Sequence, residues 1–320
     1  MFPNKIMKED QVKKNLSFLI VFAFTLCFLL SCGGNPSDTS TVQSMKLSTD
    51  YKNMKFDKEN FPVLDGSTAN IPLAKLIIQR LLEISGDEAD ALINFHTTPA
   101  AYEQLAHGLS DLLLVYNPAD ATKKTLADRN VELEYHSIGR DALVFIVNEQ
   151  NPITSLTTKQ VQDIYTGKIK NWKELGGKDL EIVAFQRPET SGSQALMDQL
   201  IMKNLTKMQA PVELIPAGMG GLIEGIASYK NTGGAIGYSV FYYADTMYKT
   251  PGLKFIKIDD VAPSNESIAN GAYPHTNDFY AVINKNENRA NVINLLNWIL
   301  SEEGKKAITD AGYVWVEDKK

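Results

Sequence analysis

The sequence predicts an α/β fold made of two lobes. From residue 61 onward, short apolar runs alternate with segments whose apolar residues recur at helical spacing, as expected for strands and helices that succeed one another. Some 260 residues follow residue 60, which is enough for two lobes of ordinary domain size. We expect the first lobe to comprise residues 60–145 and 279–320 and the second to comprise residues 146–278.

The first lobe is expected to begin with three strands and two helices. Apolar runs at residues 61–64, 92–95 and 111–116 predict the strands. One helix should begin near Pro72, because proline fits a first helical turn and the apolar residues after it share one face. Another helix should open at residues 97–99.

The second lobe is expected to begin and end with strands that cross from the first. Residues 141–148 should form the outgoing crossing, and Thr157 or Thr158 should cap a helix that Gly167 stops. A glycine-rich turn is expected at residues 218–221, just before a further helix. Other strands should lie at residues 182–185, 235–240, 254–258 and 279–284, and the last helix should run to about residue 304 on the first lobe.

The first 31 residues are expected to be a lipoprotein signal peptide. Lys8, Lys13 and Lys14 precede an apolar run at residues 16–30, which is short for a membrane span and ends just before Cys32. Cysteine at that point resembles the bacterial lipoprotein signal, in which the cysteine becomes the lipidated N-terminus and can carry palmitate. The alternative is an uncleaved anchor helix; either way, the folded part should lie outside the cytoplasm. Polar residues 32–59 would form a flexible tether.

Composition excludes several classes of function. Without residues 1–31, the chain has 28 basic and 36 acidic side chains, a net charge of −8, whereas nucleic-acid surfaces are more often basic. Its two cysteines are Cys27, within the signal, and Cys32, so no thiol remains for a disulfide or a zinc cluster.

A cluster at residues 187–193 (RPETSGS) looks like an oxyanion site. It lies between a predicted strand and a predicted helix, where unpaired backbone N–H groups and the helix dipole favour an anion. Arg187 offers a planar, permanently charged fork, Ser191 and Ser193 offer hydroxyl donors, and Gly192 permits close approach. The alternative is an ordinary capped helix start with a surface arginine.

No catalytic or metal-binding arrangement stands out. The four histidines, which we interpret as surface or satisfied side chains, lack metal-ligand spacing. Ser193 follows a glycine but lacks the second glycine of a nucleophile elbow, so a hydrolase acting through Ser193 is the last alternative. We expect neither enzymatic activity nor a cofactor.

Several motifs in order resemble the phosphate-binding proteins of bacterial phosphate ABC importers, which have the periplasmic binding protein type II fold. The resemblance spans about residues 61–316. Its motifs are residues 146–148 (IVN), Asn151-Pro152, residues 164–167 (IYTG), Asn171-Trp172, Arg187, residues 191–193 (SGS), residues 234–238 (GAIGY), Gly304 and Gly312-Tyr313.

The resemblance implies a monomeric, hinged protein that closes on phosphate and delivers it to the permease subunits of an importer. Each lobe would be a mixed sheet flanked by helices, and the hinge would lie near residues 143–148 and 276–281. The phosphate ligands implied by position are Thr68, the Ala69 amide, Thr98, Arg187, Ser191, Gly192 and Ser193, with Tyr116 and Asn117 at the end of the strand at residues 111–116.

One position departs from the family pattern. The family commonly has a carboxylate just after that strand, where it accepts the proton of hydrogen phosphate and so rejects sulfate. Here Tyr116 and Asn117 stand there, and Asp120, Asp141 or Glu189 could substitute. The alternatives are therefore a receptor for another tetrahedral oxyanion, such as sulfate, arsenate or molybdate, and a partner-binding or signalling lipoprotein that reuses the fold.

Overall fold

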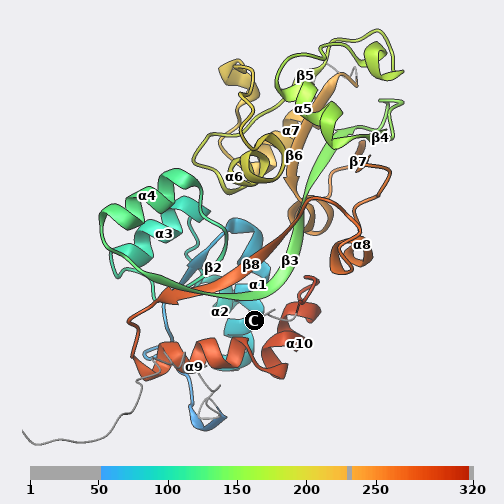
Figure 1. Cartoon of the computed structure of the whole chain (residues 1–320). Coiled ribbons are helices and arrows are strands. Elements are labelled where there is room, and N and C mark those ends of the chain that lie inside the picture. The colour runs from blue at the N-terminus through green and yellow to red at the C-terminus, as the bar shows by residue number, and fades with distance from the viewer. Residues whose placement is uncertain (1–51, 229–232, 317–320) are drawn as a thin grey trace, which may run out of the picture. The chain divides into compact units, whose positions relative to one another are not determined.

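Figure 1 shows the computed structural model of the chain, which describes residues 52–228 and 233–316. The chain divides into two units, Met1–Lys46 and Leu47–Lys320, and every described element belongs to the second. The predicted signal peptide, Cys32 and the tether up to residue 51 lie outside the described residues. Within the described ranges, each helix is too short or too polar to cross a membrane.

The described residues contain eight strands, which form the framework of the fold. They are β1 (Leu64–Gly66), β2 (Leu112–Tyr116), β3 (Leu133–Asn148), β4 (Ser155–Leu156), β5 (Val183–Ala184), β6 (Ala235–Val240), β7 (Leu253–Ile258) and β8 (Thr276–Asn284).

Helices connect these strands and cover them. They are α1 (Ile71–Leu82), α2 (Gly86–Asp90), α3 (Thr98–Ala106), α4 (Asp120–Asp128), α5 (Thr158–Tyr165), α6 (Gly192–Leu196), α7 (Met219–Ser228), α8 (Asn265–Ala269), α9 (Ala290–Ile299) and α10 (Glu302–Asp310). Short 3₁₀ turns are η2 (Thr68–Asn70), η3 (Trp172–Leu175) and η5 (Val212–Leu214), and π-type turns are η4 (Met197–Met202) and η6 (Tyr243–Met247).

The long strand β3 belongs to two sets of strands. Its residues 133–142 pair with β8, which in turn pairs with β2, and β2 pairs in parallel with β1; we call this set the first sheet. Its residues 143–148 pair with β6 and β7, and β5 pairs in parallel with β6; we call this set the second sheet. The change of partner lies close to the boundary expected at residue 145. The lobe boundaries themselves stay a prediction.

Helices cover both faces of the first sheet, as Figure 1 shows for α3 and α4 on one side and α1, α9 and α10 on the other. Leu113 and Val115 of β2 pack with Tyr102 of α3, whereas Leu112 and Leu114 face the main core. A strand that is buried on both faces needs apolar residues at successive positions, which explains the unbroken apolar run of β2.

Four local expectations were wrong. The strand expected at residues 61–64 lies at Leu64–Gly66 instead. Residues 92–95 form no strand, although Ile93 and Phe95 still pack against the core. The predicted last helix is two helices, because Ser301 accepts a hydrogen bond from the Gly304 amide and so starts α10. The glycine-rich turn is shorter than expected, since α7 begins at Met219.

Candidate functional site

Arg187 is a buried cation surrounded by neutral groups. Its Nη2 donates to the Ala217 carbonyl (2.7 Å), its Nε donates to the Pro216 carbonyl (3.0 Å), and its Nη1 donates to Ser193 Oγ (3.3 Å). Burial lowers the pKa of the guanidinium below its ordinary value. Among the described residues, no carboxylate forms an ion pair with it. An uncompensated buried charge is costly, so this site is suited to a bound anion.

The helix start at residues 191–193 is both a cap and a set of donors. Ser191 precedes α6 and its hydroxyl accepts a hydrogen bond from the Gln194 amide (3.1 Å), as in any capped helix. The alternative interpretation, an ordinary capped helix start with a surface arginine, is therefore correct about the cap. It is wrong about Arg187, which is only 6% exposed and is joined to this helix through Ser193.

Thr98 lies against Gly192. A Cβ atom added at Gly192 would come within 2.9 Å of Thr98 Oγ1, closer than side chains normally approach. Thr98 begins α3, whose preceding residue Thr97 makes no side-chain cap. A second contact joins the turns that follow β2 and α6, because Gln199 Nε2 of η4 donates to the Pro118 carbonyl (3.3 Å). The structure thus brings the predicted donors of α3 and α6 together.

Thr68 and Ala69 form the turn η2 before α1. The Ala69 amide donates to Ser67 Oγ (3.3 Å), and the Ala69 carbonyl accepts a hydrogen bond from Tyr313 Oη (2.6 Å). In the described part of the chain, no hydrogen bond joins this turn to residues 187–193. The predicted Ala69 donor is therefore already engaged, weakly, by its neighbour Ser67.

Tyr116 forms a hydrogen bond with one of the three carboxylates that could substitute for the one common in the family. Its hydroxyl donates to Asp141 Oδ2 (2.8 Å), and Asp141 also accepts hydrogen bonds from the Ala142 amide (2.7 Å) and the Tyr242 amide (3.1 Å). Burial raises the pKa of Asp141 to about 6, against the effect of these hydrogen bonds. Burial also raises the pKa of Tyr116.

The other two carboxylates are at the surface. Asp120 is exposed and forms an ion pair with Lys123 (2.9 Å), and Glu189 is exposed. Asn117 is half-buried in the turn that follows β2. Asp141 is thus the candidate that touches Tyr116.

Sequence reasoning missed a pair that joins two of the predicted donor turns. Asp65 Oδ2 lies 2.7 Å from His96 Nδ1, and Asp65 Oδ1 accepts hydrogen bonds from the His96 amide (2.8 Å) and the Gly66 amide (2.6 Å). The sequence holds a weak signal for it, because Asp65 comes three residues before Thr68 and His96 comes two residues before Thr98.

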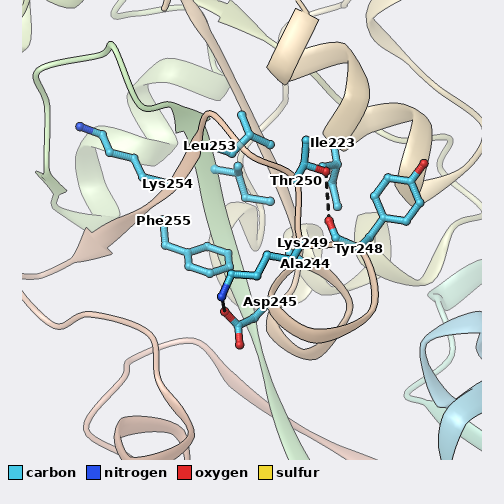
Figure 2. Close-up of a pocket in the computed structure, with 10 residues that line it drawn as sticks. Ile223, Ala244, Asp245, Tyr248, Lys249, Thr250, Leu253, Lys254 and Phe255 are labelled. Atoms are coloured by element: carbon cyan, nitrogen blue, oxygen red, sulfur yellow. Dashed lines mark hydrogen bonds and ion pairs between the residues drawn. The ribbon is translucent and has the colours of Figure 1, made fainter.

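A pocket elsewhere in the molecule, shown in Figure 2, does not contain the predicted site residues. It lies beside β7 and η6, and its rim includes Asp245 and Lys249, whose charged groups are 3.9 Å apart. Lys254 also lines it, so its charged lining residues are one carboxylate and two ammonium groups.

The described residues give no support to metal or hydrolytic chemistry. No group of three or more candidate ligands for a metal ion occurs among them. Ser193 Oγ accepts a hydrogen bond from Arg187, and among the described residues no histidine accepts one from it, so the described part of the chain gives it no general base.

Comparison with known families identifies the class of this protein. The model of the PBP superfamily domain matches residues 63–303, so the chain belongs to the PBP superfamily. Its mixed α/β fold, with sheets flanked by helices, is periplasmic-binding-protein-like, and the predicted fold class is confirmed.

Individual relatives have names more specific than that of the superfamily. The phosphate-binding protein PstS of Bacillus subtilis is 28% identical over 311 residues, which cover 97% of each chain, and PstS of Borreliella burgdorferi is 23% identical over 270 residues, covering 82% of this chain and 92% of that one. The resemblance seen in the sequence is confirmed. Because these relatives are binding proteins, the prediction that the chain is not an enzyme is confirmed as well.

Two solved structures share the fold. One, from Clostridium perfringens, is described as a phosphate ABC transporter substrate-binding protein with bound phosphate; its TM-score is 0.63 at 24% identity, over 79% of this chain and 98% of that one. The other is an ABC-type phosphate transport receptor from Vibrio cholerae, with a TM-score of 0.59 at 20% identity, over 79% of this chain and 99% of that one.

Proposed function

We propose that this chain is an extracytoplasmic, lipid-anchored solute-binding protein that captures inorganic phosphate and delivers it to the permease of an ABC importer. Phosphate would bind between the two predicted lobes, in a monomer that closes by a hinge. The names of the relatives support phosphate as the ligand, and the descriptions of the two structures that share the fold, which name phosphate ABC transport, support an importer as the partner.

The observation that carries the proposal is the environment of Arg187. Arg187 is 6% exposed as a residue, and its guanidinium donates to carbonyl and hydroxyl oxygens without a counter-charge within the described structure. A tetrahedral dianion would provide this charge and could accept additional hydrogen bonds. The proposed phosphate ligands are Thr68, Ala69, Thr98, Tyr116, Asn117, Arg187, Ser191, Gly192 and Ser193.

The hydrogen bonding of Tyr116 supports phosphate, rather than a fully ionised oxyanion, as the ligand. Because its hydroxyl proton is directed to Asp141, its oxygen presents lone pairs to any further partner. A ligand that carries a proton, such as hydrogen phosphate, could donate to that oxygen, whereas sulfate has no proton to donate. This chemistry would replace the carboxylate that the family commonly has at this position.

Calorimetric titration of the purified full chain, stripped of bound ligand, tests the proposal with phosphate and sulfate as separate ligands. We expect phosphate to bind and to raise the unfolding temperature. A ligand at 100 times its Kd adds about 2.7 kcal/mol to the free energy of unfolding. Binding of sulfate with similar affinity would favour the broader oxyanion receptor. Binding of neither anion would contradict the proposal and favour a partner-binding lipoprotein.

The lipid anchor needs a separate test, since Cys32 lies outside the described residues. We expect mass spectrometry of the chain from bacterial membranes to show a lipidated N-terminus at Cys32. The Cys32→Ser variant should lose that modification and appear in the soluble fraction. An unmodified chain that begins at residue 1 would instead indicate the uncleaved anchor helix.

A further inference from the structure

A carboxylate held by the backbone sets the orientation of the Tyr116 hydroxyl. Asp141 Oδ1 accepts hydrogen bonds from the amides of Ala142 (2.7 Å) and Tyr242 (3.1 Å). Asp141 Oδ2 lies 2.8 Å from Tyr116 Oη. An ionised carboxylate can only accept hydrogen bonds, so the hydroxyl proton of Tyr116 points at Asp141. Asp141 is 2% exposed, so bulk solvent does not compete for these bonds.

Tyr116 lies among the elements that supply the proposed ligands. Its carbonyl accepts a hydrogen bond from Tyr102 Oη (3.0 Å) of α3, one turn from the start of that helix. Its ring centre lies 6.2 Å from that of Phe279, which lies 5.3 Å from that of Tyr313, the residue that donates to the Ala69 carbonyl. Among the described residues, none donates a hydrogen bond to Tyr116 Oη. The hydroxyl oxygen therefore keeps an acceptor position for a further partner.

The two oxygens of Asp141 have different partners, and this difference decides what a substitution there would do. The two backbone amides require an acceptor at the Oδ1 position, because two donors that face each other lose a hydrogen bond. In Asp141→Asn, the side-chain oxygen would therefore take the Oδ1 position and the NH2 group would face Tyr116 Oη. The NH2 group would donate to the tyrosine oxygen, and the hydroxyl proton would turn away from residue 141. The hydroxyl would then offer a ligand a donor where it now offers an acceptor.

We infer that Asp141 is the positioning residue that determines which oxyanion the site accepts, because it keeps the Tyr116 hydroxyl an acceptor towards the ligand. Hydrogen phosphate can donate its proton to this oxygen. Sulfate, which has no proton, would place one acceptor against another. The inference rests on the proposed phosphate-binding function and adds to it the residue that controls anion selectivity.

Protonation of Asp141 should act in the same way as the amide substitution. Burial raises its pKa to about 6, and the proton would add to Oδ2 because Oδ1 faces the two amides. On β8, the uncharged Asn277 is paired with Asp141, and Asp278 forms an ion pair with Arg140 (2.8 Å). The other titratable side chains that face Asp141 are tyrosines whose pKa values burial raises, so that they stay neutral: Tyr116 on β2, Tyr242 after β6 and Tyr313 after α10. Rejection of sulfate should therefore weaken as pH falls through about 6.

The test is calorimetric titration of inorganic phosphate and of sulfate, separately, into the full chain stripped of bound ligand. At a slightly alkaline pH Asp141 is ionised, and there we expect the wild type to prefer phosphate. Asp141→Asn should lose roughly tenfold of this preference and should bind sulfate more tightly than the wild type does. A folding defect could weaken the binding of both anions, but it could not strengthen the binding of sulfate.

Two further variants separate the orientation of the hydroxyl from the loss of a charge. In a Tyr116→Phe background, Asp141→Asn should leave the preference between the anions unchanged, because the hydroxyl through which it acts is missing. The matched control is Asp278→Asn, which removes a half-buried carboxylate from the neighbouring strand β8, where it is paired with Arg140. It should leave the preference unchanged. Thermal unfolding without ligand checks that each variant is folded.

Sulfate also provides the pH readout, because it stays fully ionised while phosphate changes its own protonation. Its affinity for the wild type should rise as pH falls through about 6, and Asp141→Asn should show a smaller rise. If the wild type prefers phosphate and Asp141→Asn keeps the same preference, the inference is overturned and the proposed function stands. A wild type that binds both anions equally would overturn the inference and favour the broader oxyanion receptor. If the wild type binds neither anion, both fail.

Discussion

At the residue scale, Arg187 and Gly192 contribute to the candidate site in opposite ways. Arg187 brings a charge into a place where carbonyl oxygens hold its orientation. Gly192 brings no side chain, and this absence lets α6 begin against Thr98. The candidate site therefore combines one group that is suited to attract an anion with one position where added atoms would clash with Thr98.

Replacement of Arg187 by alanine should weaken phosphate binding by about 2–5 kcal/mol, the usual range when one partner of a buried charge pair is removed. Calorimetric titration measures the effect. Arg129→Ala removes an exposed arginine and should leave the affinity unchanged. Unchanged phosphate affinity in the Arg187 variant would contradict its role as a ligand.

Gly192→Ala should weaken phosphate binding and lower stability by about 1–3 kcal/mol, because the new methyl group would lie 2.9 Å from Thr98 Oγ1. The control is Gly218→Ala, where an added Cβ meets nothing within 4 Å. Affinity is measured by titration and stability by thermal unfolding. Equal behaviour of the two variants would show that the contact with Thr98 is unimportant.

At the element scale, β3 links its two sheets through a polar contact as well as through its backbone. Asp141 precedes the change of partner between Ala142 and Leu143. Its carboxylate binds Tyr116 at the end of β2 and the Tyr242 amide just after β6. The charge state of one side chain can thus affect elements on both sides of the crossing.

Asp141→Asn should remove a pH-dependent loss of stability. The pKa of Asp141 is raised to about 6 in the folded protein, whereas an unfolded aspartate has a pKa of about 4. The folded state therefore holds this proton more tightly, and that stabilisation is present at low pH and is lost as pH rises through about 6.

Thermal unfolding from pH 4 to pH 7 measures the difference between wild type and variant. The variant should gain up to about 3 kcal/mol relative to the wild type as pH rises over this range. Asp120→Asn, at an exposed position, is the control. A constant difference across the pH range would contradict the prediction.

Local signals predicted elements well and contacts between distant segments poorly. The Thr157 cap of α5 and the apolar run of β2 are properties of neighbouring residues, and both were predicted. Residues 92–95 have the composition of a strand, but core packing holds them as a loop. The pairing of His96 with Asp65 joins residues 31 positions apart, and no local pattern specifies it.

At the scale of the whole molecule, an acidic protein is proposed to bind an anion. The full chain has a formal net charge of −6 at pH 7, and removal of the signal would make it more negative. The attraction must then come from Arg187 and the nearby helix starts, while the rest of the surface repels phosphate at long range.

Salt should therefore increase the association rate of phosphate. Added sodium chloride screens long-range repulsion between exposed charges but acts less on the buried Arg187. Stopped-flow measurements from about 10 to 150 mM salt would show this, because the Debye length falls from about 30 to 8 Å. A rate that falls with salt would mean that surface charges attract the ligand.

The position of β8 has a consequence for the order in which the chain can fold. This strand lies between β2 and β3 in the first sheet, yet it is the last of the described strands along the chain. The strands of the second sheet all lie within residues 133–258 and can pair as soon as that stretch has been synthesised. The first sheet stays in two pieces until residues 276–284 arrive, so its completion is a late step that closes a loop of more than 100 residues.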